Sequence, residues 1–141
     1  MVLSIAGSDS SGGAGIQADL KTFSALGVYG ATAITAITAQ NTKGVNSQLA
    51  ISPEMVYSQI VAVVEDIAPS AIKIGMLANK EVAIIVADAL SRYNIPTILD
   101  PVMVSSSGHR LLSLDAQEVV KERLLPLSTL VTPNIPEMEA L

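Results

Sequence analysis

The 141-residue sequence predicts an α/β fold in which helices cover both faces of a mostly parallel central sheet, a three-layer αβα arrangement. Two observations lead to this fold class. Short apolar runs that end at glycine or at polar residues alternate with helical patterns along the whole chain. Half of the residues are apolar, which is enough for one substantial core. No linker, repeat or low-complexity segment interrupts the pattern, so we expect a single domain over residues 1–141.

The first unit is a strand, a glycine-rich loop and a helix. Val2 to Ala6 is a short apolar run that closes on a glycine, as expected of a buried strand. The loop Gly7-Ser8-Asp9-Ser10-Ser11-Gly12-Gly13-Ala14-Gly15 follows, and helical spacing begins near Ala14. Gly27 stands where a helix of this length would stop. The apolar positions of this helix are Ile16, Leu20, Phe23 and Leu26.

The second unit begins with a strand predicted over Ala31 to Thr38, because Ala, Ile and Thr fill it without helical periodicity. Residues 44–51 fit either a loop or a short edge strand. Ser52 then supplies an N-cap, and Pro53 occupies the first helical position. The helix that follows should bury one stripe, made of Val56, Ile60, Val63, Val64 and Ile67.

Three further strands and two further helices complete the alternation. Asn79 is expected to cap one helix, and a second helix is expected from about Asp115 to Leu125, with Asp115 and Glu118 at capping-box spacing. The strands are predicted at residues 71–75, 97–99 and 130–131. A new helical pattern starts at the end of the sequence, which suggests the N-terminal half of a larger α/β domain.

Charge and composition exclude several classes of function. The net charge is −5, so nothing attracts the chain to nucleic acid or to an anionic membrane surface. Cysteine is absent, which excludes disulfides, thiolate catalysis and cysteine-bound zinc. The first residues lack the basic region of a signal peptide, and no apolar run reaches membrane-spanning length. We therefore expect a cytoplasmic protein whose partners are small molecules.

The glycine loop resembles two phosphate-binding motifs and satisfies neither. A P-loop requires Lys followed by Ser or Thr after its last glycine, and that pair is missing. The segment 13–18 matches the dinucleotide fingerprint G-x-G-x-x-A, but no acidic residue lies between Asp19 and Glu54 to bind a ribose. A plain strand-to-helix connection is the structural alternative. We therefore assign the loop to the side of the site that binds the second substrate.

Polar groups follow the predicted strands at their carboxyl ends, where open parallel sheets bind ligands. Carboxylates and several amides would meet at this edge of the sheet, which suits a magnesium-bound phosphate beside a hydrogen-bonding heterocycle. The groups, in chain order, are Gly7-Ser8-Asp9, Gln40-Asn41-Thr42, Gly75-Met76-Leu77, Asp100-Pro101-Val102, and Asn134 with Glu137.

The sequence resembles the hydroxymethylpyrimidine and phosphomethylpyrimidine kinases of thiamine biosynthesis, which have the ribokinase-like fold. The segments that carry the resemblance are 5–22, 38–42, 73–77, 100–103 and 132–137, and similarity covers essentially the whole chain. It implies ATP-dependent phosphorylation of 4-amino-5-hydroxymethyl-2-methylpyrimidine and then of its monophosphate, in a homodimer. Pyridoxal kinases share some of these motifs, so a pyridoxal or pyridoxine kinase is the enzymatic alternative. A ligand-binding half-domain without catalysis is the other.

The resemblance also implies roles for particular residues. Gln40 would pair with the aminopyrimidine edge, because an amide both donates and accepts; a solvent-facing strand end is its structural alternative. The acceptor-binding residues would be Gly7, Asp19, Gln40, Met76 and Val102, although Met76 and Val102 could equally be core. Asp100, Asn134 and Glu137 would hold the nucleotide phosphates, with Asp100 and Glu137 toward Mg²⁺. Turn chemistry and a helix cap are the alternatives for these three.

Two departures from the family pattern affect this prediction. Relatives often have lysine where this chain has Ser106, so a phosphate contact would be missing. The catalytic residues remain unknown, because in the family the group that activates the acceptor hydroxyl, the anion hole and most of the adenine site belong to a second half. His109, the only histidine, is interpreted as a loop residue rather than a base.

Overall fold

The computed structural model describes residues 1–104 and 111–141. Its strands are β1 (Val2–Asp9), β2 (Gly30–Asn41), β3 (Gly44–Ala50), β4 (Ala71–Ile74), β5 (Thr97–Leu99) and β6 (Leu130–Val131). Its helices are α1 (Gly15–Ala25), α2 (Pro53–Ile67), α3 (Lys80–Leu90), α4 (Leu114–Val119) and α5 (Ile135–Ala140), and a π-helical turn, η1 (Val120–Leu124), continues α4.

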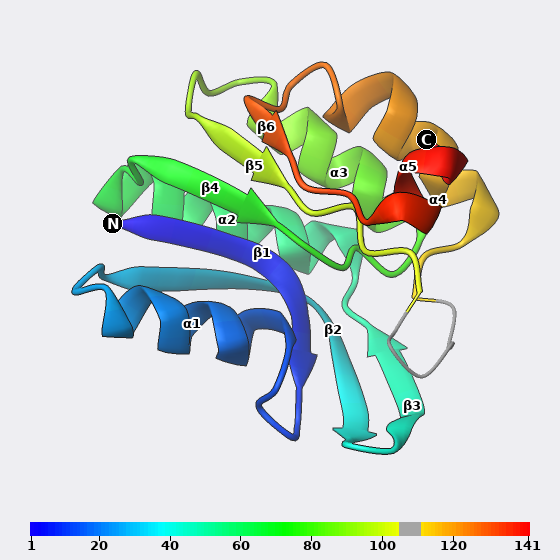
Figure 1. Ribbon diagram of the computed structural model, residues 1–141. Coiled ribbons are helices and arrows are strands. Elements are labelled where there is room, and N and C mark those ends of the chain that lie inside the picture. The colour runs from blue at the N-terminus through cyan, green and yellow to red at the C-terminus, as the bar shows by residue number, and fades with distance from the viewer. Residues whose placement is uncertain (105–110) are drawn as a thin grey trace.

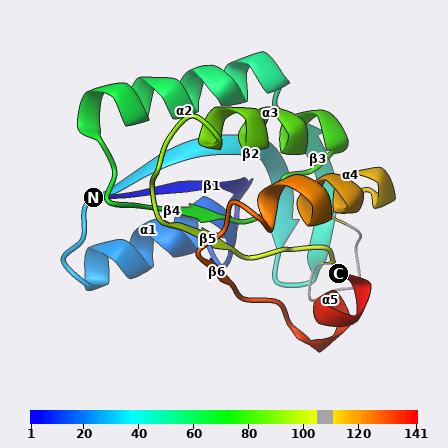
Figure 2. The same ribbon diagram turned by 90° about the horizontal axis from the view of Figure 1, so that it is seen from above.

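The strands form one six-stranded sheet in the order β3-β2-β1-β4-β5-β6. Every neighbouring pair is parallel except β2 and β3, which form an antiparallel hairpin at one edge. Helix α1 covers one face, while α2, α3 and α4 cover the other (Figures 1 and 2). The predicted three-layer α/β fold with a mostly parallel sheet is thereby confirmed, and residues 44–51 are resolved in favour of an edge strand.

The two faces of the sheet are packed very differently. Toward α2 and α3 the central strands present large apolar side chains, and Leu3, Ile5 and Ile72 are fully buried there. Because side chains alternate along a strand, the opposite face of the same strands carries small or polar residues such as Ser4 and Lys73. Helix α1 buries only Ile16 completely against that face. The face under α1 is therefore the one with room for a ligand.

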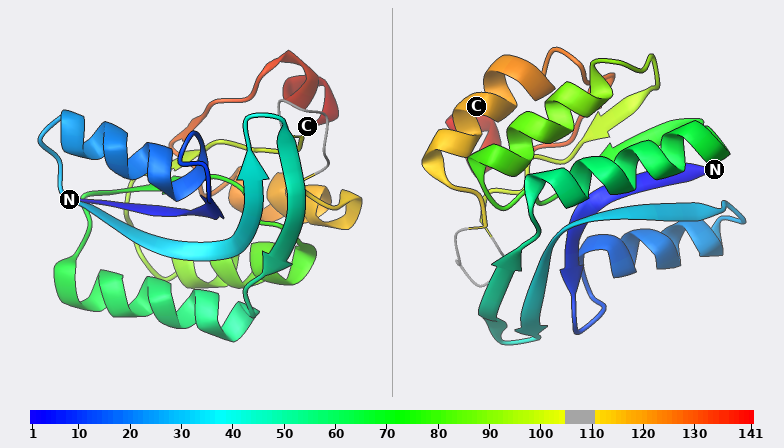
Figure 3. Two further views of the ribbon diagram at one scale, coloured as in Figure 1. Left: turned by 90° about the horizontal axis from the view of Figure 1, so that it is seen from below. Right: turned by 180° about the vertical axis from the view of Figure 1, so that it is seen from behind.

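Two strands extend beyond the ends predicted from the sequence. Strand β1 runs on to Asp9, because a register shift between Ala6 and Ser8 lets the chain keep pairing with β2 beyond the glycine. Strand β2 likewise extends to Asn41. The hairpin of β2 and β3 curves away from the rest of the sheet (Figure 3). Gly7, Ser8 and Asp9 thus belong to a strand, and the loop proper begins at Ser10.

Two predictions about helices are wrong. Asp115 and Glu118 do not form a capping box, since α4 begins one residue earlier and Ser113 is its N-cap. Ile67 does not join the buried stripe of α2. It is 43% exposed because it lies at the last turn, next to Ala68 in the left-handed conformation. The caps predicted at Ser52 and Asn79 are confirmed, since each side chain accepts the backbone N–H of the residue three positions further on, Met55 and Val82 respectively.

None of the helices found in residues 1–104 and 111–141 is both long and apolar enough to cross a membrane.

Candidate active site

A cavity of about 320 Å³ opens at the carboxyl ends of β1, β2, β4 and β5, beside the start of α1. All five residues predicted to bind the acceptor line it, namely Gly7, Asp19, Gln40, Met76 and Val102. Asp100, predicted on the phosphate side, lines it too. Segments up to about a hundred residues apart in sequence therefore converge here, as expected where parallel strands end side by side.

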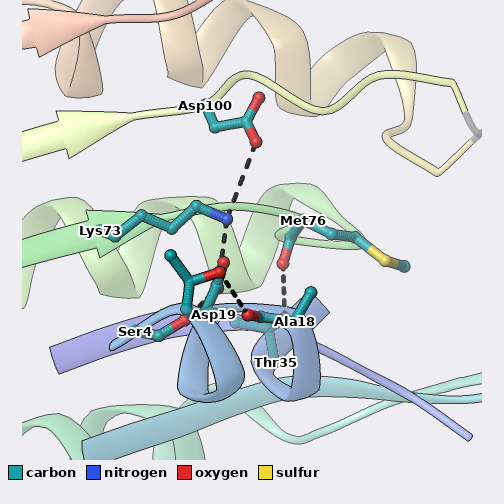
Figure 4. A network of polar contacts seen from close by, with 8 residues as sticks. Ser4, Ala18, Asp19, Thr35, Lys73, Met76 and Asp100 are labelled. Carbon is teal, nitrogen blue, oxygen red and sulfur yellow. Dashed lines mark hydrogen bonds and ion pairs between the residues drawn. The ribbon is translucent and has the colours of Figure 1, made fainter. Parts of the chain in front are cut away.

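One wall of the cavity is apolar. Met76 is buried, and its Sδ would lie only 3.0 Å from a Cβ placed on Gly7, so the thioether rests directly on the glycine backbone. Thr35 Oγ1 donates a hydrogen bond of 2.6 Å to the Met76 carbonyl oxygen, which fixes that segment (Figure 4). Val102 packs against the same cluster. This wall could contact the flat face of a heterocycle, while Met76 also serves the core.

Gln40 presents an amide to the cavity from the end of β2. Ser10 holds its backbone from both sides: Ser10 Oγ donates to the Gln40 carbonyl oxygen, and Gln40 N donates to Ser10 Oγ, each at 2.8 Å. Within the described residues, the Gln40 side chain makes one hydrogen bond, a long one of 3.4 Å that its Oε1 accepts from Thr38 Oγ1. The backbone is thus fixed while most of the amide's hydrogen-bonding capacity remains available to a ligand.

Three charged side chains lie in a row across the cavity (Figure 4). Lys73 Nζ lies 3.2 Å from Asp19 Oδ2 and 3.7 Å from Asp100 Oδ2. This row of side chains therefore joins an acidic residue of α1, a basic residue of β4 and an acidic residue that follows β5. Asp19 belongs to the predicted acceptor side and Asp100 to the predicted phosphate side, so one ammonium group connects the two.

Asp100 carries its negative charge under unfavourable conditions. Burial raises the pKa of its carboxyl group, and the nearby carboxylates of Glu137 and Asp19 raise it further, while Lys73 opposes them. Its side chain is about one third exposed. A cation or a hydrogen-bond donor from a ligand would relieve this excess of negative charge.

Asp9 lines the same cavity but is satisfied by its own loop. Its Oδ1 accepts from Ser11 N at 2.8 Å, and its Oδ2 accepts from Gly13 N at 3.0 Å and Ala14 N at 2.9 Å. Burial alone would raise the pKa of Asp9, but these hydrogen bonds more than offset burial and lower it. The loop amides that could have received a phosphate are therefore already occupied by a carboxylate.

Asn134 and Glu137 are not among the residues that line this cavity. They form a capping box at the start of α5: Glu137 N donates to Asn134 Oδ1 and Asn134 N donates to Glu137 Oε2, both at 2.9 Å. The helix-cap alternative is therefore correct as far as local structure goes. The cap does not exclude a ligand role, because the Glu137 carboxylate is close enough to act on the pKa of Asp100.

The predicted Mg²⁺ site was tested on its donor set. Asp100 and Glu137 are hard oxygen ligands, and a cation that keeps most of its waters needs only one or two carboxylates. Within residues 1–104 and 111–141, no group of three or more His, Cys, Asp or Glu side chains could hold a metal ion. Asp100 and Glu137 are chemically suited to a cation that keeps most of its waters, and their role toward Mg²⁺ stays a prediction.

Sequence reasoning missed Lys73 and Ser4 as site residues. It placed Asp9 at this edge of the sheet without predicting that the Asp9 carboxylate would be occupied by its own loop. A lysine inside the short apolar strand Ala71–Ile74 was a usable signal, because such a strand buries both faces and an unpaired charge there would be costly. Ser4 gave no comparable signal, since serine is common in strands of any kind. Ser106 and His109 lie outside the described residues.

The family model described as phosphomethylpyrimidine kinase matches residues 9–141. A hydroxymethylpyrimidine/phosphomethylpyrimidine kinase of Rhizobium meliloti is 56% identical over 137 residues, covering 97% of this chain and 52% of that protein. The chain spans about half the length of the curated relatives it matches.

Solved structures give the same picture of similarity. A crystal structure of phosphomethylpyrimidine kinase from Clostridium difficile superposes with a TM-score of 0.92 at 54% identity, covering 98% of this chain and 60% of that one. A pyridoxal kinase from Staphylococcus aureus in complex with pyridoxal superposes with a TM-score of 0.87 at 36% identity, covering 99% of this chain and 52% of that one.

Proposed function

This chain belongs to the phosphomethylpyrimidine kinase family, and from that premise we propose that its protein phosphorylates an aminopyrimidine alcohol with ATP and then phosphorylates the resulting monophosphate. The observation that carries the proposal is the convergence of Gln40, Asp19 and the Met76 wall on one cavity. An aminopyrimidine presents a ring nitrogen beside an exocyclic amine, and a single amide pairs with both.

The proposed mechanism assigns one task to each side of the cavity. Gln40 and Asp19 bind and orient the heterocycle against Met76 and Val102, so that its hydroxymethyl group faces the Asp100 side. Asp100, Asn134 and Glu137 would hold the nucleotide phosphates and magnesium, which when bound would neutralise charge on the transferring phosphoryl group. Catalysis then depends on in-line positioning of two substrates, and this chain would supply the acceptor pocket together with part of the phosphate side.

The remaining proposals concern the whole protein. We propose that residues 1–141 form the N-terminal half of one larger kinase domain, because the relatives are about twice as long. The other half would carry the group that activates the acceptor hydroxyl. The negative net charge supports a small-molecule acceptor rather than nucleic acid. A cytoplasmic homodimer is proposed from the resemblance to the family.

Pyridoxal kinase activity is the second candidate, favoured by the 36% identity and close superposition of the pyridoxal-bound neighbour. Steady-state kinetics of the full-length protein on both acceptors decide between them. We expect a higher kcat/KM with the aminopyrimidine alcohol, and a clear preference for pyridoxal would overturn the choice. Binding of the aminopyrimidine to the 141-residue chain, measured by calorimetry without turnover, would instead favour a half-domain that only binds ligand.

The same kinetics test the site through Gln40→Ala. The substitution removes an amide that is proposed to hydrogen-bond the acceptor and not the nucleotide. We therefore expect the acceptor KM to rise about 10-fold and the ATP KM to stay within about two-fold. Gln117→Ala, on α4 at the opposite face of the sheet, is the matched control and should change neither. Equal losses for both substrates would contradict the assignment of Gln40 to the acceptor.

A further inference from the structure

We propose that Lys73 is a positioning residue for the acceptor, acting through Asp19, and that Gly75 gives its ammonium group the room to do so. The inference rests on the proposed function, in that it assumes that the cavity takes the acceptor. Lys73 and Gly75 belong neither to the apolar wall of Met76 and Val102 nor to the amide contact proposed for Gln40. Three features of the structure support it.

The first feature is the way in which Asp19 is held. Ser4 and Lys73 are directly paired in register across β1 and β4, so their side chains project side by side toward α1. Both reach the same atom: Asp19 Oδ2 accepts from Ser4 Oγ at 2.6 Å and from Lys73 Nζ at 3.2 Å. Ser4 is completely buried, which makes this a fixed anchor rather than a surface contact.

The consequence is an asymmetric carboxylate. Oδ2 of Asp19 is used by the protein, whereas no donor in the described part of the chain is paired with Oδ1. Asp19 lines the cavity and its side chain is 16% exposed. The second oxygen is therefore the one that remains to accept a hydrogen bond from a ligand. The acceptor class that fits is a heterocycle that carries an amino or hydroxyl donor.

The second feature is the space above Gly75. Lys73 and Gly75 lie on the same side of the chain, two residues apart. A Cβ on Gly75 would lie 2.9 Å from Lys73 Nζ and 3.1 Å from the Ala6 Cβ. The ammonium group thus lies over a position without a side chain, and that vacancy lets the lysine extend along the strand to the cavity.

The third feature is the charge balance. Lys73 is the one basic residue among those that line the cavity in the described part of the chain, and it lies between two carboxylates. Without it, the Asp19 and Asp100 carboxylates would repel each other across the cavity. That repulsion would favour rotation of the Asp19 carboxylate away from Asp100. The hydrogen bond from Ser4 would then be weakened, and Asp19 would lose its orientation toward the ligand.

The test uses the full-length protein with four variants. Lys73→Met removes the charge and keeps the length, Lys73→Arg keeps the charge, and Gly75→Ala displaces the ammonium group. Lys121→Met, at an exposed position of η1, is the control. Because hydrogen bonds to charged groups contribute most to polar recognition, we expect Lys73→Met to raise the acceptor KM at least about 10-fold. Lys73→Arg should recover most of that loss, and Gly75→Ala should be intermediate.

A double-mutant cycle with Asp19→Asn isolates the route of the effect. If Lys73 acts through Asp19, adding Lys73→Met to Asp19→Asn should raise the acceptor KM by no more than about two-fold, although each single change is large. Multiplying losses would overturn the inference, and so would a Lys73→Met enzyme with the parental acceptor KM. A uniform fall in kcat and thermal stability without a change in acceptor KM would show a purely structural role.

Failure of the proposed function gives a different result. In that case the parental protein itself would not phosphorylate the aminopyrimidine alcohol. The same cycle would then be measured with pyridoxal, whose ring hydroxyl is also a donor. An acceptor KM for pyridoxal that is unchanged by Lys73→Met would overturn the inference there too.

Discussion

Asp9 and Asp100 line the same cavity, yet they meet opposite conditions. Asp9 is almost completely buried and accepts hydrogen bonds from three backbone amides and the Ser11 hydroxyl, and its pKa is lowered. Asp100 is partly exposed and its one described ionic partner, Lys73, is 3.7 Å away, and its pKa is raised. The same functional group is thus fully satisfied at one position and poorly satisfied at the other.

This difference in hydrogen bonding and pKa indicates a structural role for Asp9 and a ligand-binding role for Asp100. A carboxylate whose oxygens are occupied by its own loop has little left to offer a substrate, however close it lies. A carboxylate held in an unfavourable charged state is stabilised by whatever cation or donor arrives, which is typical of functional positions. Damage to the Asp9 loop should therefore reduce stability, whereas changes at Asp100 should reduce function and leave stability nearly intact.

Gly15→Ala should give the largest effect on stability. Gly15 has φ +56°, a conformation that is strained for alanine. A Cβ there would also overlap the carbonyl oxygen of Gly7. We expect the free energy of unfolding to fall by at least about 3 kcal/mol, measured by denaturant titration. Gly27→Ala is the matched control, because φ is +69° there but a Cβ would meet nothing within 4 Å. It should lose only about 1–2 kcal/mol.

Asp9→Asn should come next. The amide can accept through one oxygen only, so either the Ser11 amide or the pair at Gly13 and Ala14 loses its acceptor. A loss of about 1.5–3 kcal/mol in the free energy of unfolding is expected at neutral pH. A stability unchanged from the parental protein would mean that the loop does not depend on this carboxylate.

The pH dependence has a definite sign at Asp9. Its folded-state pKa is lowered, so its contribution to stability is complete above the unfolded-state value near 4 and is lost as pH falls through the lower folded value. The destabilisation caused by Asp9→Asn should therefore shrink below about pH 4. Glu118→Gln, an exposed acidic residue of α4, is the control and should show no such convergence.

The sequence was sufficient for the layers, the order of elements and the position of the five predicted acceptor-side residues, which all line the cavity. Alternating apolar runs and helical stripes depend on local pattern, and the strand ends then follow from topology alone. Gln40, Met76 and Asp100 were therefore placed together correctly, although their roles remain predictions. The fold also resolved one open choice, since residues 44–51 form the edge strand β3.

Long-range polar pairing could not be predicted in the same way. The hydrogen bonds of Asp9 to the amides of its own loop need a strand that continues past Gly7, and the register shift that permits this has no clear local signature. The contact of Lys73 with Asp19 joins residues 54 positions apart, and only the fold brings them together. Asn134 and Glu137 had two compatible interpretations in sequence, and the structure realises the cap directly.

Asp100→Asn should have the smallest effect on stability, and its direction distinguishes the two carboxylates. Because the folded-state pKa of Asp100 is raised, ionisation at neutral pH opposes folding, and the penalty disappears as pH falls below the unfolded value near 4. Removing the charge should stabilise the protein at pH 7 by less than about 1 kcal/mol, since the side chain is partly solvated.

The full-length Asp100→Asn protein should nevertheless lose turnover, because the group that is unfavourable for folding is the one proposed to face the phosphates. Denaturant titrations at pH 7 and pH 4, together with steady-state kinetics, measure both effects on one preparation. Converging stabilities at low pH with lost turnover would place Asp100 in the ligand site. A marked loss of stability at pH 7 would instead put Asp100 beside Asp9 as scaffold, and the contrast between the two carboxylates would fail.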